Sequence, residues 1–220
     1  MRKLASLIAI VLLSVVNGAC AVELQEKKNF ASYNPPRPTE AQDRIEVIEF
    51  FWYGCSHCFD FEPALHTWVK KLPADVAFRR VPAVFPRSGS PGPWAPAASL
   101  YYSLEAMNLT EKLHGDVFSA VHNERRADLL SDKAAMTTWL GRKGIDTKAF
   151  SDAYESFSVH SKVARSMQLS DQAYNLDGVP AIIVDGRYRA IATSDRSEDY
   201  LATVDALIDK VRKERSAKKK

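Results

Sequence analysis

Two cysteines, Cys55 and Cys58, lie three positions apart in the sequence, separated by Ser56 and His57. Cysteines at this spacing can close a small disulfide, whereas an ordinary structural bridge rarely closes so short a loop. A helix that begins at the first cysteine would expose its sulfur and direct unpaired backbone N–H groups at it, which favours the thiolate. The remaining cysteine, Cys20, lies within a predicted leader. The pattern therefore predicts a redox-active pair rather than a structural disulfide.

Two ionisable residues lie close to this pair in the sequence. His57 can donate a hydrogen bond or lend positive charge to the Cys55 thiolate, which would lower the pKa of that cysteine; the alternative is an ordinary surface histidine. Glu49 interrupts the apolar run from Val47 to Tyr53, six residues before Cys55. A buried carboxylate normally takes up a proton or finds a partner. We expect Glu49 to accept a proton from Cys58, and the alternative is a strand residue that faces water.

The same cysteines could instead bind zinc or copper(I) if one or two histidines completed the site. The sequence holds no second cysteine pair. The other histidines are scattered along the chain without ligand spacing: His66, His114, His122 and His160. We therefore predict no metal site, and no cofactor beyond the redox-active Cys55–Cys58 disulfide itself.

Residues 1–21 have the pattern of a secretory signal peptide. Two basic residues precede an apolar run from Leu4 to Val16, and Ala19-Cys20-Ala21 forms a small-residue cleavage site. The apolar run is shorter than the roughly 20 residues needed to span a bilayer. We expect a periplasmic protein that is soluble once the leader is removed, in a compartment that permits disulfides. The alternative is that Cys20 becomes a lipidated N-terminus.

The mature chain keeps about 200 residues, enough for one core or for one core with an inserted subdomain. Removal of the two basic residues in the leader lowers the formal charge from +3 to +1. A nearly neutral chain argues against nucleic acid as the principal partner. We expect a monomer, with the basic tail at residues 216–220 extending into solvent.

The first half of the mature chain alternates strand and helix patterns. A short strand at 29–33 precedes a proline-rich connector, and residues 45–53 form a nearly continuous apolar run. Such a run is typical of a central parallel strand that is covered on both faces. The helix after the cysteines should kink at Pro63, and alternating residues predict another strand at 76–81.

Residues 97–174 contain no convincing strand and several helix signals. Asn108 with Glu111 resembles a capping box, and Ser131 and Asp146 could each cap a helix. Strand character returns at 181–184 and 187–191, on either side of an Asp-Gly hairpin signal, and a last helix begins near residue 197. This order predicts an α/β domain interrupted by an all-helical insertion. The predicted parts are a first α/β segment at 22–93, the insertion at 94–175 and a second α/β segment at 176–215.

The run from Phe50 to Glu62 (FFWYGCSHCFDFE), taken with Gly178-Val179-Pro180, resembles the DsbA family of exported thiol–disulfide oxidases. The resemblance covers essentially the whole mature chain. It implies a thioredoxin fold with a helical insertion, and it makes Cys55 the attacking and leaving sulfur and His57 a main determinant of oxidising power. It also implies a cis Pro180 that faces Cys55, with the Val179 backbone binding an extended substrate. Ser56 departs from the proline often found in the family.

The resemblance implies a dithiol oxidase that donates its disulfide to newly exported proteins and is reoxidised by a DsbB-like membrane quinone reductase. A disulfide isomerase or reductase is the nearest alternative. Exported isomerases usually carry a dimerisation domain before the catalytic one, yet only a short mature segment precedes Ile45. A peptide-binding or metal-binding module on the same fold is the remaining alternative.

Overall fold

The centre of the molecule is a five-stranded sheet with the strand order β1-β5-β4-β2-β3. The computed structural model describes residues 22–41, 43–86 and 92–217. The predicted leader and Cys20 lie outside these residues, as do the last three residues of the tail. The strands are β1 (Phe30–Ser32), β2 (Ile45–Phe51), β3 (Val76–Pro82), β4 (Ala181–Val184) and β5 (Tyr188–Ala190).

Strand β2 is an interior strand, between β4 and β3, and all seven of its residues are buried, as its apolar run predicted. It pairs in parallel with β3 but antiparallel with β4, so only one of its two neighbours has the predicted direction. The Asp185-Gly186 turn joins β4 to β5 as predicted. Asp185 and Gly186 both have positive φ, 56° and 62°, which is the backbone conformation that Asp-Gly hairpin turns require.

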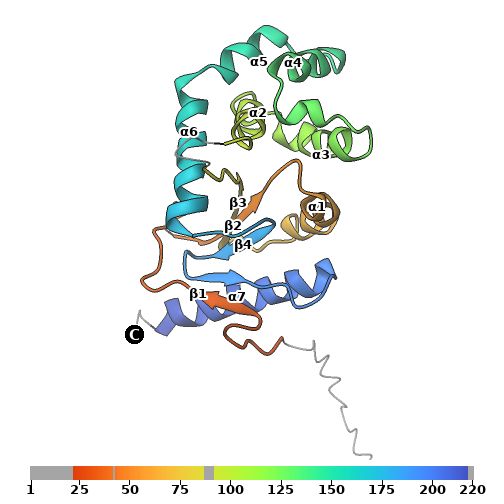
Figure 1. Cartoon of the computed structure of the whole chain (residues 1–220). Helices are drawn as coiled ribbons and strands as arrows, with labels where there is room; N and C mark the ends of the chain where they lie inside the picture. Colours follow the sequence, from red (N-terminus) through yellow and green to blue (C-terminus); the bar gives the residue numbers. More distant parts are fainter. Residues whose placement is uncertain (1–21, 42, 87–91, 218–220) are drawn as a thin grey trace, which may run out of the picture.

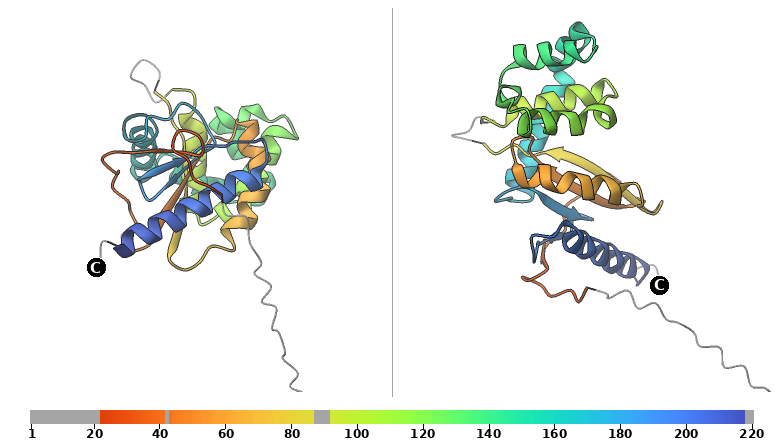
Figure 2. Two further views of the ribbon diagram at one scale, coloured as in Figure 1. Left: turned by 90° about the horizontal axis from the view of Figure 1, so that it is seen from below. Right: turned by 90° about the vertical axis from the view of Figure 1, so that its right-hand side faces the viewer.

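Two helices cover one face of the sheet. They are α1 (Ser56–Val69), which contains Pro63, and α7 (Ser197–Ala217). Phe61 and Leu65 of α1 pack with Val204 and Leu207 of α7 against Val47 of β2. Figure 2 shows these two helices lying beside one another against the sheet. The first cysteine of the predicted redox pair therefore lies at the start of a helix that the sheet core holds in place.

In its described part, the chain between β3 and β4 forms helices joined by loops and contains no strand, as predicted (Figure 1). Its helices stack beyond the sheet, and α6 runs from this helical block back to the sheet. A short 3-10 turn and a π-helical turn complete the block. The elements are α2 (Ala95–Ala106), α3 (Thr110–His122), η1 (Ala127–Leu130), α4 (Lys133–Arg142), α5 (Thr147–Tyr154), α6 (Phe157–Met167) and η2 (Gln168–Ala173).

One of the three predicted helix caps in this block is confirmed. The Asp146 side chain accepts from two backbone N–H groups at the start of α5. The capping box at Asn108 is wrong, because Asn108 has a φ of 56° and ends the turn after α2, and the cap of α3 has no side-chain bond. Ser131 is also wrong, because it terminates η1 and leaves the next residue, Asp132, to cap α4.

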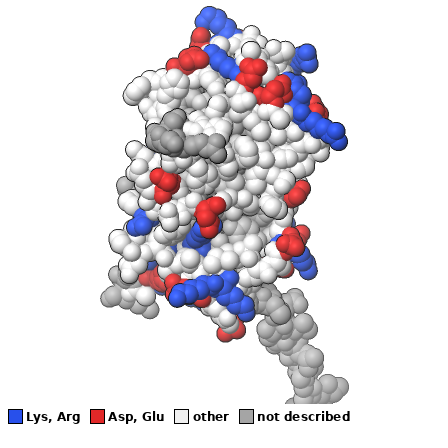
Figure 3. Space-filling model, in the orientation of Figure 1, with Lys and Arg blue, Asp and Glu red and all other residues white. Residues whose placement is uncertain are grey.

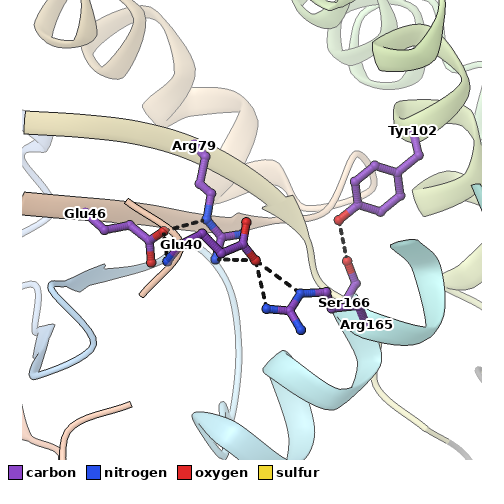
Figure 4. A network of polar contacts seen from close by, with 6 residues as sticks. All are labelled: Glu40, Glu46, Arg79, Tyr102, Arg165 and Ser166. Atoms are coloured by element: carbon purple, nitrogen blue, oxygen red, sulfur yellow. Dashed lines mark hydrogen bonds and ion pairs between the residues drawn. The ribbon is translucent and has the colours of Figure 1, made fainter. Parts of the chain in front are cut away.

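A polar network joins α6 to the sheet (Figure 4). Glu46 of β2 is buried, and its carboxylate accepts from Arg79 Nε at 3.1 Å and from the Glu40 backbone N–H at 3.0 Å. Arg165 of α6 donates to the Glu40 carboxylate at 2.8 Å. Beside this network, the hydroxyls of Tyr102 on α2 and Ser166 on α6 lie 2.6 Å apart. These contacts fix α6 against the face of the sheet opposite α1.

Charges on the face shown in Figure 3 are mixed in sign. Acidic and basic side chains lie interspersed along the upper and lower edges, and most of the surface between them carries neither. This distribution agrees with the small formal net charge of the chain, +3. Among the described residues, no helix has both the length and the apolar character that crossing a membrane requires.

Candidate active site

Cys55 is the N-cap residue of α1, so the helix begins where the sequence predicted. Its backbone is extended (φ −88°, ψ 116°), and its sulfur accepts a hydrogen bond from the Cys58 backbone N–H at 3.3 Å. The Cys55 side chain is half-buried, whereas Cys58 is fully buried. Both cysteines carry free thiols in this structure. The helix start therefore presents one sulfur outward and keeps the other within the core.

The two thiols have opposite acidities. Hydrogen bonds from the Cys58 side chain and backbone, together with the positive charge of His57, lower the pKa of Cys55 from 9.0 to about 6, against the opposing effect of burial. Burial raises the pKa of Cys58 far above its ordinary value, and the hydrogen bond to Cys55 and the charge on Cys55 raise it further. Cys55 is therefore a thiolate at neutral pH, while Cys58 holds its proton.

His57 is exposed, and both its positive charge and its backbone N–H lower the pKa of Cys55. It also lines a cleft of about 620 Å³ that runs along Pro180 toward the β5–α7 connection. The histidine thus faces solvent beside the reactive sulfur. This position agrees with the predicted interaction with the thiolate.

The loop before β4 lies directly against the reactive cysteine. The Cys55 thiol donates to the carbonyl oxygen of Val179, with 3.4 Å between sulfur and oxygen. The Val179–Pro180 peptide bond is cis, as the resemblance implied. Both loop residues are partly exposed. The structure therefore brings Cys55 and His57 together with Val179 and Pro180, which lie more than a hundred residues later in the sequence.

Glu49 is fully buried, so the alternative of a strand residue that faces water is wrong. Side chains alternate along a strand, and Glu49 shares the α1 face of β2 with Val47. Its Oε2 accepts from Arg80 Nε at 3.1 Å, while its Oε1 has no hydrogen-bond partner among the described residues. Burial raises the pKa of Glu49 to about 8, and the Arg80 charge opposes this rise. Glu49 also acts electrostatically on the Cys58 thiol.

Sequence reasoning missed the partners of Glu49. Arg80 pairs with Glu49 in the parallel β2–β3 register and also donates to Glu62 of α1 at 2.7 Å. The second carboxylate oxygen of Glu62 lies 3.5 Å from Nε2 of His114 on α3. Nδ1 of His114 lies 2.9 Å from the Tyr53 hydroxyl. The alternating pattern of β3 placed Arg80 in a strand, but nothing in the sequence indicated that His114 would reach this group.

Helix α3 holds the active-site loop through a second histidine. His122 Nε2 lies 2.9 Å from the carbonyl oxygen of Tyr53, and its ring stacks on Phe59 with centroids 4.8 Å apart. On the other side of the loop, a Cβ at Gly54 would lie 2.5 Å from the ring of Trp52, so only glycine fits there. His122 therefore ties the loop before the cysteines to α3, and the close approach of Trp52 leaves no room for a side chain at Gly54.

Within residues 22–41, 43–86 and 92–217, no three His, Cys, Asp or Glu side chains lie close enough together to hold a metal ion. The chemistry that the described groups support is thiol chemistry. A nucleophilic sulfur lies at a helix start, a protonated sulfur lies behind it, and a buried carboxyl group lies close to the second sulfur.

Comparison with known proteins supports the same chemistry. The profile of the DSBA-like thioredoxin domain family matches residues 46–204. The thiol:disulfide interchange protein DsbA of Pseudomonas syringae is 35% identical over 215 residues, covering 96% of this chain and 97% of the relative. DsbA of Azotobacter vinelandii is 40% identical over 176 residues, which cover 80% of this chain and 78% of the relative.

The fold is similar to that of solved DsbA structures. The crystal structure of Pseudomonas aeruginosa DsbA superposes with a TM-score of 0.78 at 36% identity, covering 88% of this chain and 95% of that chain. NmDsbA1 from Neisseria meningitidis gives a TM-score of 0.75 at 27% identity. The α/β sheet with its helical insertion is thus a thioredoxin fold of the DsbA type. The chain belongs to the DSBA-like thioredoxin family and is a protein thiol–disulfide oxidoreductase.

Proposed function

We propose that this protein is a dithiol oxidase that donates the Cys55–Cys58 disulfide to newly exported proteins. The observation that carries the proposal is the contrast in acidity between the two thiols: the pKa of Cys55 is lowered to about 6 and that of Cys58 is raised. A sulfur that is stable as a thiolate is a good leaving group. Substrate dithiols should therefore reduce this disulfide readily.

The reaction has two exchange steps. A substrate thiolate attacks the Cys55 sulfur, breaks the Cys55–Cys58 bond and forms a mixed disulfide, while Cys58 leaves and takes up a proton. The second substrate thiolate then attacks the substrate sulfur of the mixed disulfide and expels the Cys55 thiolate. Two electrons pass from the substrate to the protein. One proton ends on Cys58, and the other is released to solvent, because Cys55 remains ionised at neutral pH.

Glu49 is proposed to exchange the proton with Cys58. Its raised pKa keeps it protonated at neutral pH, so it can give a proton to the departing Cys58 thiolate. It can accept the proton again when Cys58 must become a nucleophile during reoxidation. Its burial, its unpaired Oε1 and its electrostatic effect on Cys58 support this role.

Val179 and Pro180 are proposed to bind the substrate chain next to Cys55. The contact between the Cys55 sulfur and the Val179 carbonyl supports this role, because a substrate cysteine bonded to Cys55 would lie beside that backbone. Main-chain hydrogen bonding is independent of side-chain identity, so it suits an enzyme with many substrates. The cleft beside His57 and Pro180 provides room for the flanking residues.

The proposed setting is the periplasm, and the likeness to relatives named DsbA supports an exported enzyme. We also propose that the protein acts as a monomer. A DsbB-like membrane quinone reductase is proposed to return the cysteine pair to the disulfide. The likeness to DsbA proteins supports this partner.

A direct transfer assay tests the proposed activity. Oxidised protein is mixed with one equivalent of a reduced, unfolded protein that contains two cysteines, and the thiols are trapped by acid at intervals. The expected result is one disulfide in the substrate and two thiols, Cys55 and Cys58, in this protein. A Cys55→Ser variant serves as the control. A pair that stays oxidised while the substrate stays reduced would contradict the proposal and favour a reductase or isomerase.

A further inference from the structure

A cavity of about 490 Å³ lies between α1, β3 and the first two helices of the helical block. Its wall includes the side chains of Glu62, Arg80 and His114, which belong to the buried group around Glu49. Cys55, Cys58 and Glu49 do not line this cavity. The buried group therefore has a second side, separate from the surface where substrate would bind.

Two polar atoms on this side have no hydrogen-bond partner among the described residues. They are Glu62 Oε2 and His114 Nε2, which lie 3.5 Å apart. Their side chains are only 12% and 7% exposed. The other nitrogen of His114 is occupied by the Tyr53 hydroxyl at 2.9 Å. A buried polar atom without a partner is costly unless it has a further role or a water.

The charges of the group do not balance when both carboxyls ionise. Arg80 contacts Glu49 at 3.1 Å and Glu62 at 2.7 Å, so one positive charge serves two carboxylates. At rest, Glu49 carries a proton and the balance holds. Once Glu49 gives this proton to Cys58, the buried group has a net negative charge. A proton on His114 would restore the balance, because its imidazolium would pair with Glu62 and leave Arg80 to Glu49.

We infer that His114 takes up a proton from the cavity while Glu49 is ionised, and so acts as a positioning residue for proton exchange at Cys58. The inference rests on the proposed function and deepens it. Glu49 gives one proton to the Cys58 thiolate, His114 Nε2 binds one proton from water, and this proton is released when Glu49 is protonated again. One solvent proton enters for each proton left on Cys58.

The surroundings of His114 agree with a transient role. Burial lowers the pKa of His114, so the imidazole is neutral at rest and binds a proton only when a nearby negative charge appears. Ionisable groups face it from every packed element: Glu62 of α1, Tyr53 of the active-site loop, Arg80 of β3, Tyr101 of α2 and Glu111 of α3.

A double-mutant cycle tests the inference. The measured quantity is the rate at which Cys58 is released from the disulfide as a thiol. It is followed in a single turnover of oxidised protein with a reduced dithiol peptide, by acid quench and mass analysis. His114→Gln keeps a polar side chain but cannot bind a proton, and we expect the rate at pH 7 to fall about tenfold. In a Glu62→Gln background Arg80 serves Glu49 alone, so adding His114→Gln should have no further effect. If His114→Gln lowered the rate by the same factor in the wild-type and Glu62→Gln backgrounds, the inference would be overturned.

Two further measurements separate this role from a structural one. Imidazole added to His114→Ala should restore the rate, because the cavity adjoins the vacated space. The pKa of Cys55, measured from thiolate absorbance, should stay unchanged in His114→Gln. His66→Gln, at the same cavity, is the matched control and should keep the wild-type rate. A wild-type rate in His114→Gln would overturn the inference, whereas failure of the wild-type protein to oxidise the peptide would overturn the proposed function instead.

Discussion

The Cys55 sulfur lies 3.4 Å from the carbonyl oxygen of Val179, and it also contacts the backbone N–H of Cys58. The carbonyl contact requires a proton on the sulfur, whereas the contact from the Cys58 N–H, at 3.3 Å, favours the thiolate. Above the pKa of Cys55, about 6, the sulfur keeps only the second of these bonds. The Val179 carbonyl is then available to a substrate backbone at the pH where the thiolate is present.

The contrast in acidity predicts selective alkylation of the reduced protein. The rate at which iodoacetamide alkylates Cys55 should rise with pH around the pKa of this thiol, about 6, because the thiolate is the nucleophile. Cys58 should remain unmodified across the same range, since it is buried and its pKa is raised. Peptide mapping after timed labelling from pH 4 to pH 8 measures both rates. Equal rates for the two cysteines would contradict the assignment of their roles.

Removal of the buried thiol should trap substrates. In Cys58→Ser, a substrate joined to Cys55 can no longer be expelled by Cys58, so mixed disulfides with exported proteins should accumulate. Non-reducing gels of cells expressing the variant measure these adducts, and they should disappear on reduction. Cys55→Ser is the matched control and should form none. Similar adducts in both variants would show that Cys55 is not the attacked sulfur.

Replacement of Glu49 should slow proton exchange at Cys58. We expect Glu49→Gln to reduce the rate at which Cys58 is released as a thiol by about 100-fold, which is the lower end of the effect of a positioned acid or base. The pKa of Cys55 should stay almost unchanged. Glu46→Gln is the matched control, because Glu46 is a buried carboxylate on the opposite face of β2. A wild-type rate in Glu49→Gln, measured by single turnover, would return Glu49 to a structural role.

The same variant has a predicted pH dependence of stability. The pKa of Glu49 rises from 4.5 to about 8 in the folded state, so the folded protein favours the protonated carboxyl. The associated stability is present below pH 4.5 and is lost as the pH rises through about 8. The free energy of unfolding of Glu49→Gln relative to wild type should therefore increase between these pH values. Urea denaturation at several pH values measures it, and a constant difference would contradict the raised pKa.

The elements that sequence could predict are those in which local pattern and tertiary environment agree. The apolar run of β2, the Asp-Gly turn and the cap at Asp146 all form as expected. The cap at Asn108 failed because a left-handed residue ended the preceding turn. The π-helical turn after α6 was also missed, and it places Ser170 Oγ 3.3 Å from the Val84 N–H.

The redox pair was visible in the sequence because its two cysteines are local, but its proton partners were not. Arg80 and His114 reach Glu49 and Glu62 from β3 and α3, and only the packing of the helical block on α1 brings them there. Glu49 itself was ambiguous, since a carboxylate in an apolar strand can face water or core. The cover provided by α1 decides between them.

The reduced protein should be more stable than the oxidised protein, in contrast to the usual effect of a disulfide. The pKa of Cys55 is lowered from 9.0 to about 6 in the folded dithiol form. Its stabilising effect is present above pH 9 and is lost as the pH falls through about 6. In paired thermal melts, the difference in melting temperature between the reduced and oxidised forms should decrease as the pH falls from 9 to about 6. Replacement of His57 by Ser should make this difference smaller. An oxidised form that melts higher at every pH would contradict this prediction.

The redox equilibrium of the Cys55–Cys58 pair with glutathione tests the central claim most directly. The fraction of reduced protein is measured by acid trapping and mass analysis across a series of glutathione ratios at pH 7. For a dithiol oxidase we expect a reduction potential of about −120 mV, the value known for DsbA. The cysteine pair should then be largely reduced at glutathione ratios at which ordinary protein disulfides stay oxidised. A potential at or below about −230 mV, in the range of glutaredoxins and thioredoxin, would contradict the account and identify a reductase.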